Sequence, residues 1–150
     1  MPAPGISLLD ANVWLALALG DHFHHPAAME WFDRQPESSC AFCRITQMAF
    51  LRHLTNSRIV GETNVRSQAA AWLDYEAFSN DPRIVYLEEP PGIDVEFKQR
   101  TQSPHPKRSD WTDAYLAAFA GTLGLSIVTF DVDFSKMSDL VVKTLGASDN

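Results

Sequence analysis

Two short, largely apolar runs constrain the fold of this chain more than any other feature. The run ISLL at 6–9 and the run SIVTF at 126–130 do not alternate apolar with polar residues, so each predicts a strand buried on both faces. Apolar positions in the segments that follow recur at helical spacing. Strands alternating with helices predict an α/β fold, a three-layer α/β/α sandwich with a mainly parallel central sheet. We expect a single domain over residues 1–150.

The remaining elements are expected at defined places in the chain. Strands are expected at 6–9, 38–42, 83–87, 126–130 and 140–145. Helices are expected at 11–19, 26–34, 44–54, 65–78, 94–100 and 110–124, with a polar loop at 101–109.

Charge and hydropathy exclude several classes of protein. The net charge of −7 argues against a nucleic-acid binder held by a global positive field, although a local basic groove beside an acidic metal site stays compatible. No apolar run approaches the roughly 20 residues that span a bilayer, and the first residues lack the basic segment of a signal peptide. We therefore expect a cytoplasmic protein without a membrane partner.

Acidic residues stand where two predicted strands end. Asp10 directly follows 6–9, Asp131 directly follows 126–130, and parallel strands about 4.8 Å apart share one carboxyl edge. A third acid, Asp113, lies near the start of the helix at 110–124, which is apolar on every side further along. Three carboxylates at one crevice repel one another unless a cation neutralises them, and Mg²⁺ prefers hard oxygen ligands. The sequence therefore predicts a metal site of Asp10, Asp113 and Asp131.

Each acid also has a purely structural interpretation. Asp110 and Asp113 are spaced like a helix N-cap and its N3 partner, and Asp10 could cap the helix that follows it. Asp133 is expected to be a loop or capping acid. The conjunction of the three acids carries the metal hypothesis.

Other residues that could suggest sites are expected to be structural. Cys40 and Cys43 form one C-x-x-C without the further ligands of a zinc site, and on an extended segment they point to opposite faces, which argues against a disulfide. The histidines expected to have surface roles are His22, His24 and His25. The tryptophans expected in the core or in dimer contacts are Trp14, Trp31, Trp72 and Trp111.

Four segments together resemble a known family. They are LLDANVWLAL at 8–17, RITQMAFLRHLTN at 44–56, WTDAYLAAFA at 111–120 and VTFDVDF at 128–134. In order and spacing they resemble the PIN-domain family and, within it, the VapC-type toxins of bacterial toxin–antitoxin pairs. The resemblance implies an endoribonuclease dependent on Mg²⁺ or Mn²⁺ that acts on RNA, with tRNA or rRNA as the expected substrate. It also implies a homodimer and a small VapB-like antitoxin.

The family's acids carry over to Asp10, Asp113 and Asp131, and Asn12 matches the polar residue two positions after the first acid. The chain departs from the pattern at Gln47, where related toxins have a Glu in the central helix. An amide can bind the metal or its water but adds no charge, which predicts weaker metal binding. A buried glutamine satisfied by protein partners is the alternative.

The expected chemistry is hydrolysis of an RNA phosphodiester by a metal-activated water, without a covalent intermediate. The cationic side chains expected to contact phosphate are Arg44, Arg52, Lys107 and Arg108. The alternative for each is a solvated surface charge.

Three other functions share part of this pattern. An aspartyl-phosphate phosphatase would need a second acid where the chain has Asn12, and it thereby loses its general acid. No Gly-rich loop follows the first strand, which disfavours a nucleotide-binding fold. The remaining rival is a catalytically weakened PIN module that binds RNA or antitoxin without efficient cleavage because of Gln47.

Overall fold

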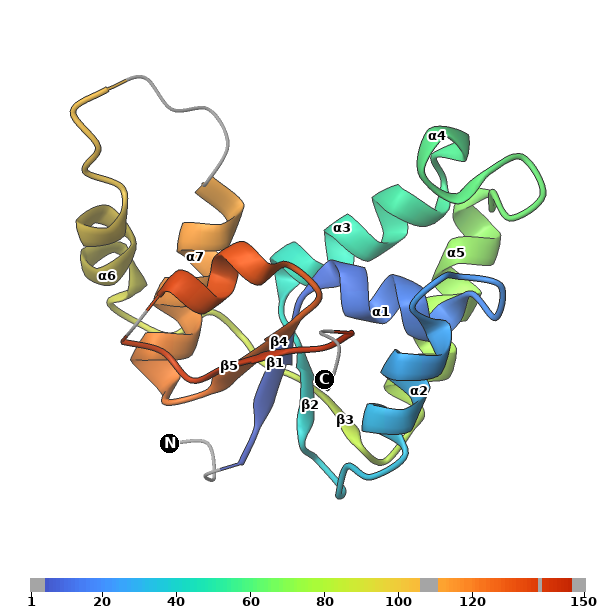
Figure 1. Cartoon of the computed structure of the whole chain (residues 1–150), viewed down its shortest axis with the longest axis horizontal. Helices are drawn as coiled ribbons and strands as arrows, with labels where there is room; N and C mark the ends of the chain where they lie inside the picture. The colour runs from blue at the N-terminus through green and yellow to red at the C-terminus, as the bar shows by residue number, and fades with distance from the viewer. Residues whose placement is uncertain (1–4, 106–110, 138, 147–150) are drawn as a thin grey trace.

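A five-stranded sheet forms the centre of the protein, here described by a computed structural model for residues 5–105, 111–137 and 139–146 (Figure 1). The strands are β1 (Ser7–Leu9), β2 (Cys40–Phe42), β3 (Ile84–Tyr86), β4 (Ser126–Thr129) and β5 (Val142–Thr144). Their order is β3-β2-β1-β4-β5, and every neighbouring pair is parallel.

Helices cover both faces of this sheet. They are α1 (Ala11–Ala18), α2 (His25–Phe32), α3 (Arg44–Leu54), α4 (Ser57–Val60), α5 (Gln68–Ser79), α6 (Ile93–Arg100) and α7 (Trp111–Leu123), with a 3-10 helix, η1 (Val132–Lys136). Figure 1 shows α1 to α5 on one side of the strands and α6 and α7 on the other. The expected α/β/α sandwich is confirmed. Within the described ranges, no helix has the length and apolar character needed to cross a membrane.

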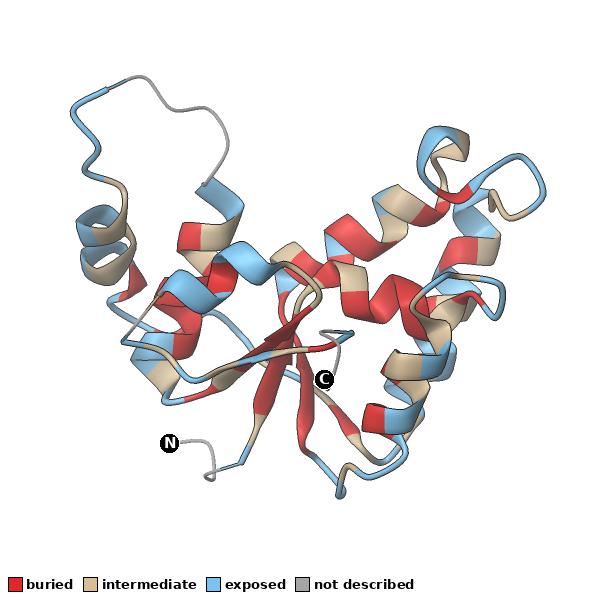
Figure 2. Ribbon diagram, in the orientation of Figure 1, coloured by how far each residue is buried: buried red, intermediate tan, exposed pale blue. Residues whose placement is uncertain are grey.

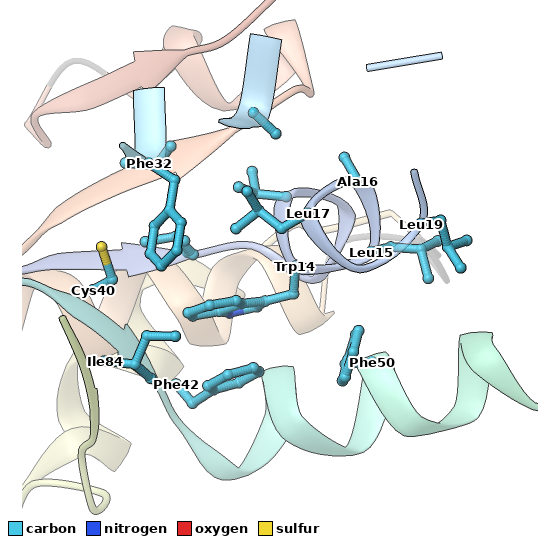
Figure 3. Close-up of a cluster of buried hydrophobic side chains, with 14 of the residues drawn as sticks. Trp14, Leu15, Ala16, Leu17, Leu19, Phe32, Cys40, Phe42, Phe50 and Ile84 are labelled. Atoms are coloured by element: carbon cyan, nitrogen blue, oxygen red, sulfur yellow. The ribbon is translucent and has the colours of Figure 1, made fainter. Parts of the chain in front are cut away.

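The larger core lies between the sheet and α1, α2, α3 and α5. Trp14 of α1 is fully buried and stacks on Phe42 of β2, with ring centroids 3.7 Å apart and planes within 8° (Figure 3). Phe50 of α3 packs beside them. This aromatic group fixes α1, which begins directly after β1, against the neighbouring strand and helix.

The second core lies on the opposite face, where Leu8, Ile127 and Phe119 pack with residues of α6 and α7. Leu8 faces this core while the adjacent Leu9 faces the first one, as the two-residue period of a strand requires. Burial on both sides explains why the strand sequences do not alternate in polarity (Figure 2).

The structure departs from the sequence expectations in a few places. Trp14 and Trp31 are buried as expected, but Trp72 and Trp111 are 45% and 55% exposed. A core position is therefore wrong for these two, and a dimer contact stays a prediction. The short helices α4 and η1 were not predicted, because a single turn is too short to show apolar periodicity. Residues 106–109 of the expected polar loop lie outside the described residues.

Candidate active site

The candidate site lies at the carboxyl edge of the sheet, where the strand order reverses. Strand β1 has β2 on one side and β4 on the other, and such a switch point opens a crevice beyond the strand ends. Leu9 pairs with Val128 in register, so Asp10 leaves β1 beside the end of β4. The Asp10 backbone N–H donates to the Val128 carbonyl over 2.9 Å, which holds the first acid against the strand that leads to Asp131.

Thr129, the last residue of β4, connects the two acids. Its hydroxyl donates to Asp10 Oδ2 over 2.8 Å and accepts the Asp131 backbone N–H over 3.0 Å. The Thr129 side chain is fully buried. Sequence reasoning missed this residue, although a threonine at the end of a doubly buried strand must find polar partners, and that was the available signal.

Asn12 supports the same segment from α1. Its Nδ2 donates to Thr129 Oγ1 over 3.3 Å, and its Oδ1 accepts the Phe130 backbone N–H over 3.2 Å. Asp131 then caps η1 by accepting the Asp133 backbone N–H over 2.9 Å. These bonds hold the backbone that carries Asp131 against the start of α1.

The charge of Asp131 acts on the carboxyl group of Asp10. Burial raises the pKa of Asp10 above its ordinary value, hydrogen bonds from Thr129 and the Ala11 N–H oppose this, and the negative charge of Asp131 raises it further. Ionised Asp10 is therefore destabilised in the metal-free protein, as expected for a carboxylate that awaits a cation.

The third acid, Asp113, comes from a helix. Asp113 lies in the first turn of α7, is half-buried, and belongs to a helix that begins at this same edge (Figure 1). Among the described residues, no three His, Cys, Asp or Glu side chains lie close enough together to hold a metal ion. Mg²⁺ needs only one or two direct carboxylates, with water in its other positions. The Asp10 and Asp131 pair fits that requirement.

Gln47 is buried, at 6% exposure, and its amide has protein partners. Oε1 accepts a 2.5 Å hydrogen bond from Arg44 Nη1, and the side chain also hydrogen-bonds with the Tyr75 hydroxyl. This geometry fits the alternative of a satisfied buried glutamine, since the described hydrogen bonds link Gln47 to neither Asp10 nor Asp131.

The candidate phosphate contacts fall in different places. Arg44 is exposed at the start of α3, and its guanidinium lies 5.5 Å from the centre of the Tyr86 ring. Arg52 is exposed two turns further along and lines a separate groove with Trp72 of α5. Lys107 and Arg108, together with Asp110, lie outside the described residues.

The cysteines and histidines have structural surroundings. Cys40 and Cys43 are buried free thiols, which confirms the absence of a disulfide, and burial raises the pKa of Cys40 to about 11. His25 Nδ1 lies 2.7 Å from the Ala16 carbonyl oxygen, and the half-buried His24 stacks on Phe130 with centroids 4.2 Å apart. His24 is therefore not a simple surface residue as expected, because it packs against Phe130, next to Asp131.

Comparisons with known proteins agree with this fold. The PIN-domain family model matches residues 7–140. Ribonuclease VapC41 of Mycobacterium tuberculosis is 41% identical over 144 residues, which cover 92% of this chain and 97% of that protein. Ribonuclease VapC31 of the same organism is 30% identical over 135 residues, covering 89% of this chain and 94% of the relative.

Solved structures share the fold at lower identity. Mycobacterium tuberculosis VapC20, described as a toxin that cleaves the sarcin–ricin loop, superposes with a TM-score of 0.63 at 15% identity, covering 86% of this chain and 92% of its own. VapBC2 of Rickettsia felis, bound to a DNA fragment from its promoter, gives a TM-score of 0.65 at 11% identity, covering 93% and 98%. The family match and the sequence relatives establish that the chain belongs to the PIN-domain family, among its VapC-type toxin ribonucleases.

Proposed function

We propose that this chain hydrolyses RNA phosphodiester bonds at the carboxyl edge of its sheet, with a divalent cation, Mg²⁺ or Mn²⁺, held by Asp10, Asp131 and Asp113. The observation that carries the proposal is that the buried Thr129 hydroxyl bonds both the Asp10 carboxyl group and the Asp131 backbone N–H, and that the Asp131 charge acts on Asp10. Such a cation, when bound, lowers the pKa of a coordinated water and stabilises the charge that develops on the phosphate.

The chain's own residues have distinct tasks in this proposal. Asp10 and Asp131 are direct ligand candidates because they share Thr129 and interact electrostatically. Asp113 acts from the first turn of α7, directly or through water. Thr129 and Asn12 orient the two acids, as hydrogen-bonding groups behind metal ligands do.

Partners follow from the same family. The Rickettsia felis structure and one from Salmonella typhimurium, both named VapBC, were solved on DNA, and a Klebsiella pneumoniae neighbour is a toxin–antitoxin complex. A VapB-like antitoxin as inhibitor, tRNA or rRNA as substrate, and a homodimeric state are therefore part of the proposal.

The test is cleavage of structured RNA pools, including total tRNA and rRNA, by antitoxin-free protein across titrations of Mg²⁺ and Mn²⁺. We expect metal-dependent cutting that Asp10→Asn abolishes. The matched control is Asp94→Asn, which removes an exposed carboxylate from α6 and should leave cutting unchanged. Metal-independent cutting, or equal cutting by Asp10→Asn, would reject the site.

Failure of the wild type to cut any pool would favour the second candidate, a weakened PIN module that binds RNA or antitoxin. One observation supports that candidate: the Gln47 amide is already engaged by Arg44 and Tyr75.

A further inference from the structure

A groove with an unusual mixture of side chains opens beside the candidate metal site. This open groove has a volume of about 390 Å³, within the roughly 300–1,000 Å³ of ordinary small-molecule sites. Its described lining residues come from three elements: the start of α3, the segment after β3 and the first turns of α7. They are Arg44, Ile45, Tyr86, Glu88, Glu89 and Tyr115.

The groove lies along the same carboxyl edge of the sheet as the candidate site. Arg44 follows β2, Tyr86 ends β3, and both strands run parallel to β1, which leads to Asp10. Arg44 also donates to Gln47, at the position where related toxins have an acid. An RNA strand bound along this edge would pass both the candidate metal site and the groove.

One wall offers a stacking surface. Tyr86 is 38% exposed, and the Arg44 guanidinium lies 5.5 Å from its ring centre. An aromatic ring and an arginine plane are the two surfaces on which unpaired RNA bases stack most often. A flat, neutral base could stack on either of these two side chains.

The lining also contains two carboxylates, one of which is held by a hydrogen bond. Tyr115 donates from its hydroxyl to Glu89 Oε1 over 2.7 Å, which fixes that carboxylate, and Glu88 lies next to it in the chain. A carboxylate accepts hydrogen bonds and donates none. Among the bases, guanine presents two adjacent donors, N1–H and the N2 amino group, which match the two oxygens of one carboxylate.

Other occupants fit this mixture less well. A backbone phosphate would be repelled by Glu88 and Glu89. A cationic side chain of a protein partner would suit the carboxylates but would meet the positive charge of Arg44 at the stacking wall. A neutral base with a donor edge satisfies the aromatic wall, the cation and the acids together.

We propose that this groove is a guanine-selecting subsite, in which the base stacks against Tyr86 and Arg44 and Glu89, oriented by Tyr115, reads its Watson–Crick edge. The inference deepens the proposed function and rests on it for the identity of the ligand as RNA.

The first experiment measures base preference during cleavage. A hairpin pool with a randomised loop is cut by the wild type and the ends are sequenced; we expect guanine at one fixed position relative to the cut. Inosine, which lacks the N2 amino group, should slow cutting about 5- to 100-fold at that position, the discrimination that a paired hydrogen bond gives. 7-Deazaguanine, which keeps the Watson–Crick edge, should be cut like guanine.

Two variants assign the preference to the groove. Glu89→Gln should reduce the ratio of guanine to inosine cutting, and Tyr115→Phe should reduce it partly because the carboxylate stays but loses its orientation. The matched control is Glu76→Gln, an exposed acid on α5, which should keep the wild-type ratio. An unchanged ratio in Glu89→Gln, or no base preference in the wild type, overturns the proposal.

A binding experiment separates this failure from failure of the proposed function. Fluorescent pentanucleotides with guanine, inosine or cytosine at the centre are titrated with the Asp10→Asn protein, which needs no cleavage to give a signal. The guanine probe should bind more tightly than the other two, and this preference should disappear in the double variant Asp10→Asn, Glu89→Gln. That result supports the subsite even if the wild type cuts nothing. Equal binding of all three probes overturns the proposal. It is also overturned if Glu89 is needed to bind a short arginine-rich peptide but not to distinguish the three bases.

Discussion

The hydroxyl of Thr129 donates a 2.8 Å hydrogen bond to Oδ2 of Asp10 and accepts the backbone N–H of Asp131 over 3.0 Å. A single buried atom on β4 thus fixes acids that follow two different strands. Because carboxylates that bind a cation must be held in place before it arrives, this contact is a requirement of the proposed chemistry as well as of packing.

Replacing the hydroxyl while keeping the shape tests this requirement. Thr129→Val leaves the Asp131 N–H without its acceptor, so we expect about 1–3 kcal/mol lower unfolding free energy. RNA cleavage should fall further, by about 10- to 100-fold, as on loss of a group that orients metal ligands. Cleavage kinetics and urea unfolding measure the two effects, and Thr129→Ser, which restores the hydroxyl, should recover most of the activity. Full cleavage by Thr129→Val would show that the hydroxyl is not required.

The raised pKa of Asp10 predicts how metal-free stability depends on pH. A carboxyl group whose pKa is higher in the folded than in the unfolded state binds its proton more tightly when folded. Its contribution to stability is therefore complete below the unfolded pKa, near 3.8, and is lost as pH rises through the raised folded pKa. In EDTA, this decline should be present in the wild type and missing in Asp10→Asn.

Mg²⁺ should reverse the effect at neutral pH. Since a ligand that binds only the folded state stabilises it, unfolding of the wild type should shift upward with added Mg²⁺, and Asp10→Asn should respond much less. Asp94→Asn serves as the exposed-acid control. The same Mg²⁺ response in all three proteins would place the cation elsewhere.

Much of this architecture was readable from the residues. The α3 boundaries, Arg44–Leu54, match the expected helix at 44–54, and the expected strands lie within one or two residues of β1 to β5. The proximity of Asp10 and Asp131 was predictable because each follows a buried strand and parallel strands end at one edge. Periodicity and position were sufficient for these elements.

The rest depended on tertiary contacts that no local pattern encodes. Trp72 and Trp111 occupy helical apolar positions yet are exposed. The sequence could not predict this, because periodicity identifies the apolar face of a helix but does not say whether another element covers that face. The partners of Gln47 come from two elements, Arg44 in α3 and Tyr75 in α5, and their pairing required the helices to be placed.

The departure at Gln47 makes a prediction about metal affinity. Gln47→Glu adds a negative charge at a buried position where related toxins have a Glu, so the Mg²⁺ concentration for half-maximal cleavage should fall if this side chain acts on the metal. Arg44 already donates to this side chain and will offset part of the gain. The charge-matched control is Gln68→Glu, at the exposed start of α5, which should leave the metal titration unchanged. If both titrations equal that of the wild type, Gln47 acts only in packing.

The aromatic stack beside β1 carries the largest expected effect on stability. Trp14 is fully buried and stacked on Phe42, and truncation of a buried aromatic side chain costs about 3–5 kcal/mol, so Trp14→Ala should lower the unfolding free energy by that amount. Trp111→Ala removes the same side chain from a position that is 55% exposed, and its cost should be much smaller. Denaturant unfolding followed by circular dichroism measures both. Equal destabilisation by the two substitutions would contradict the stacked core. Trp14 also anchors α1, the helix capped by Asp10. The folded fraction of Trp14→Ala should therefore need more Mg²⁺ for cleavage, whereas Trp111→Ala should not.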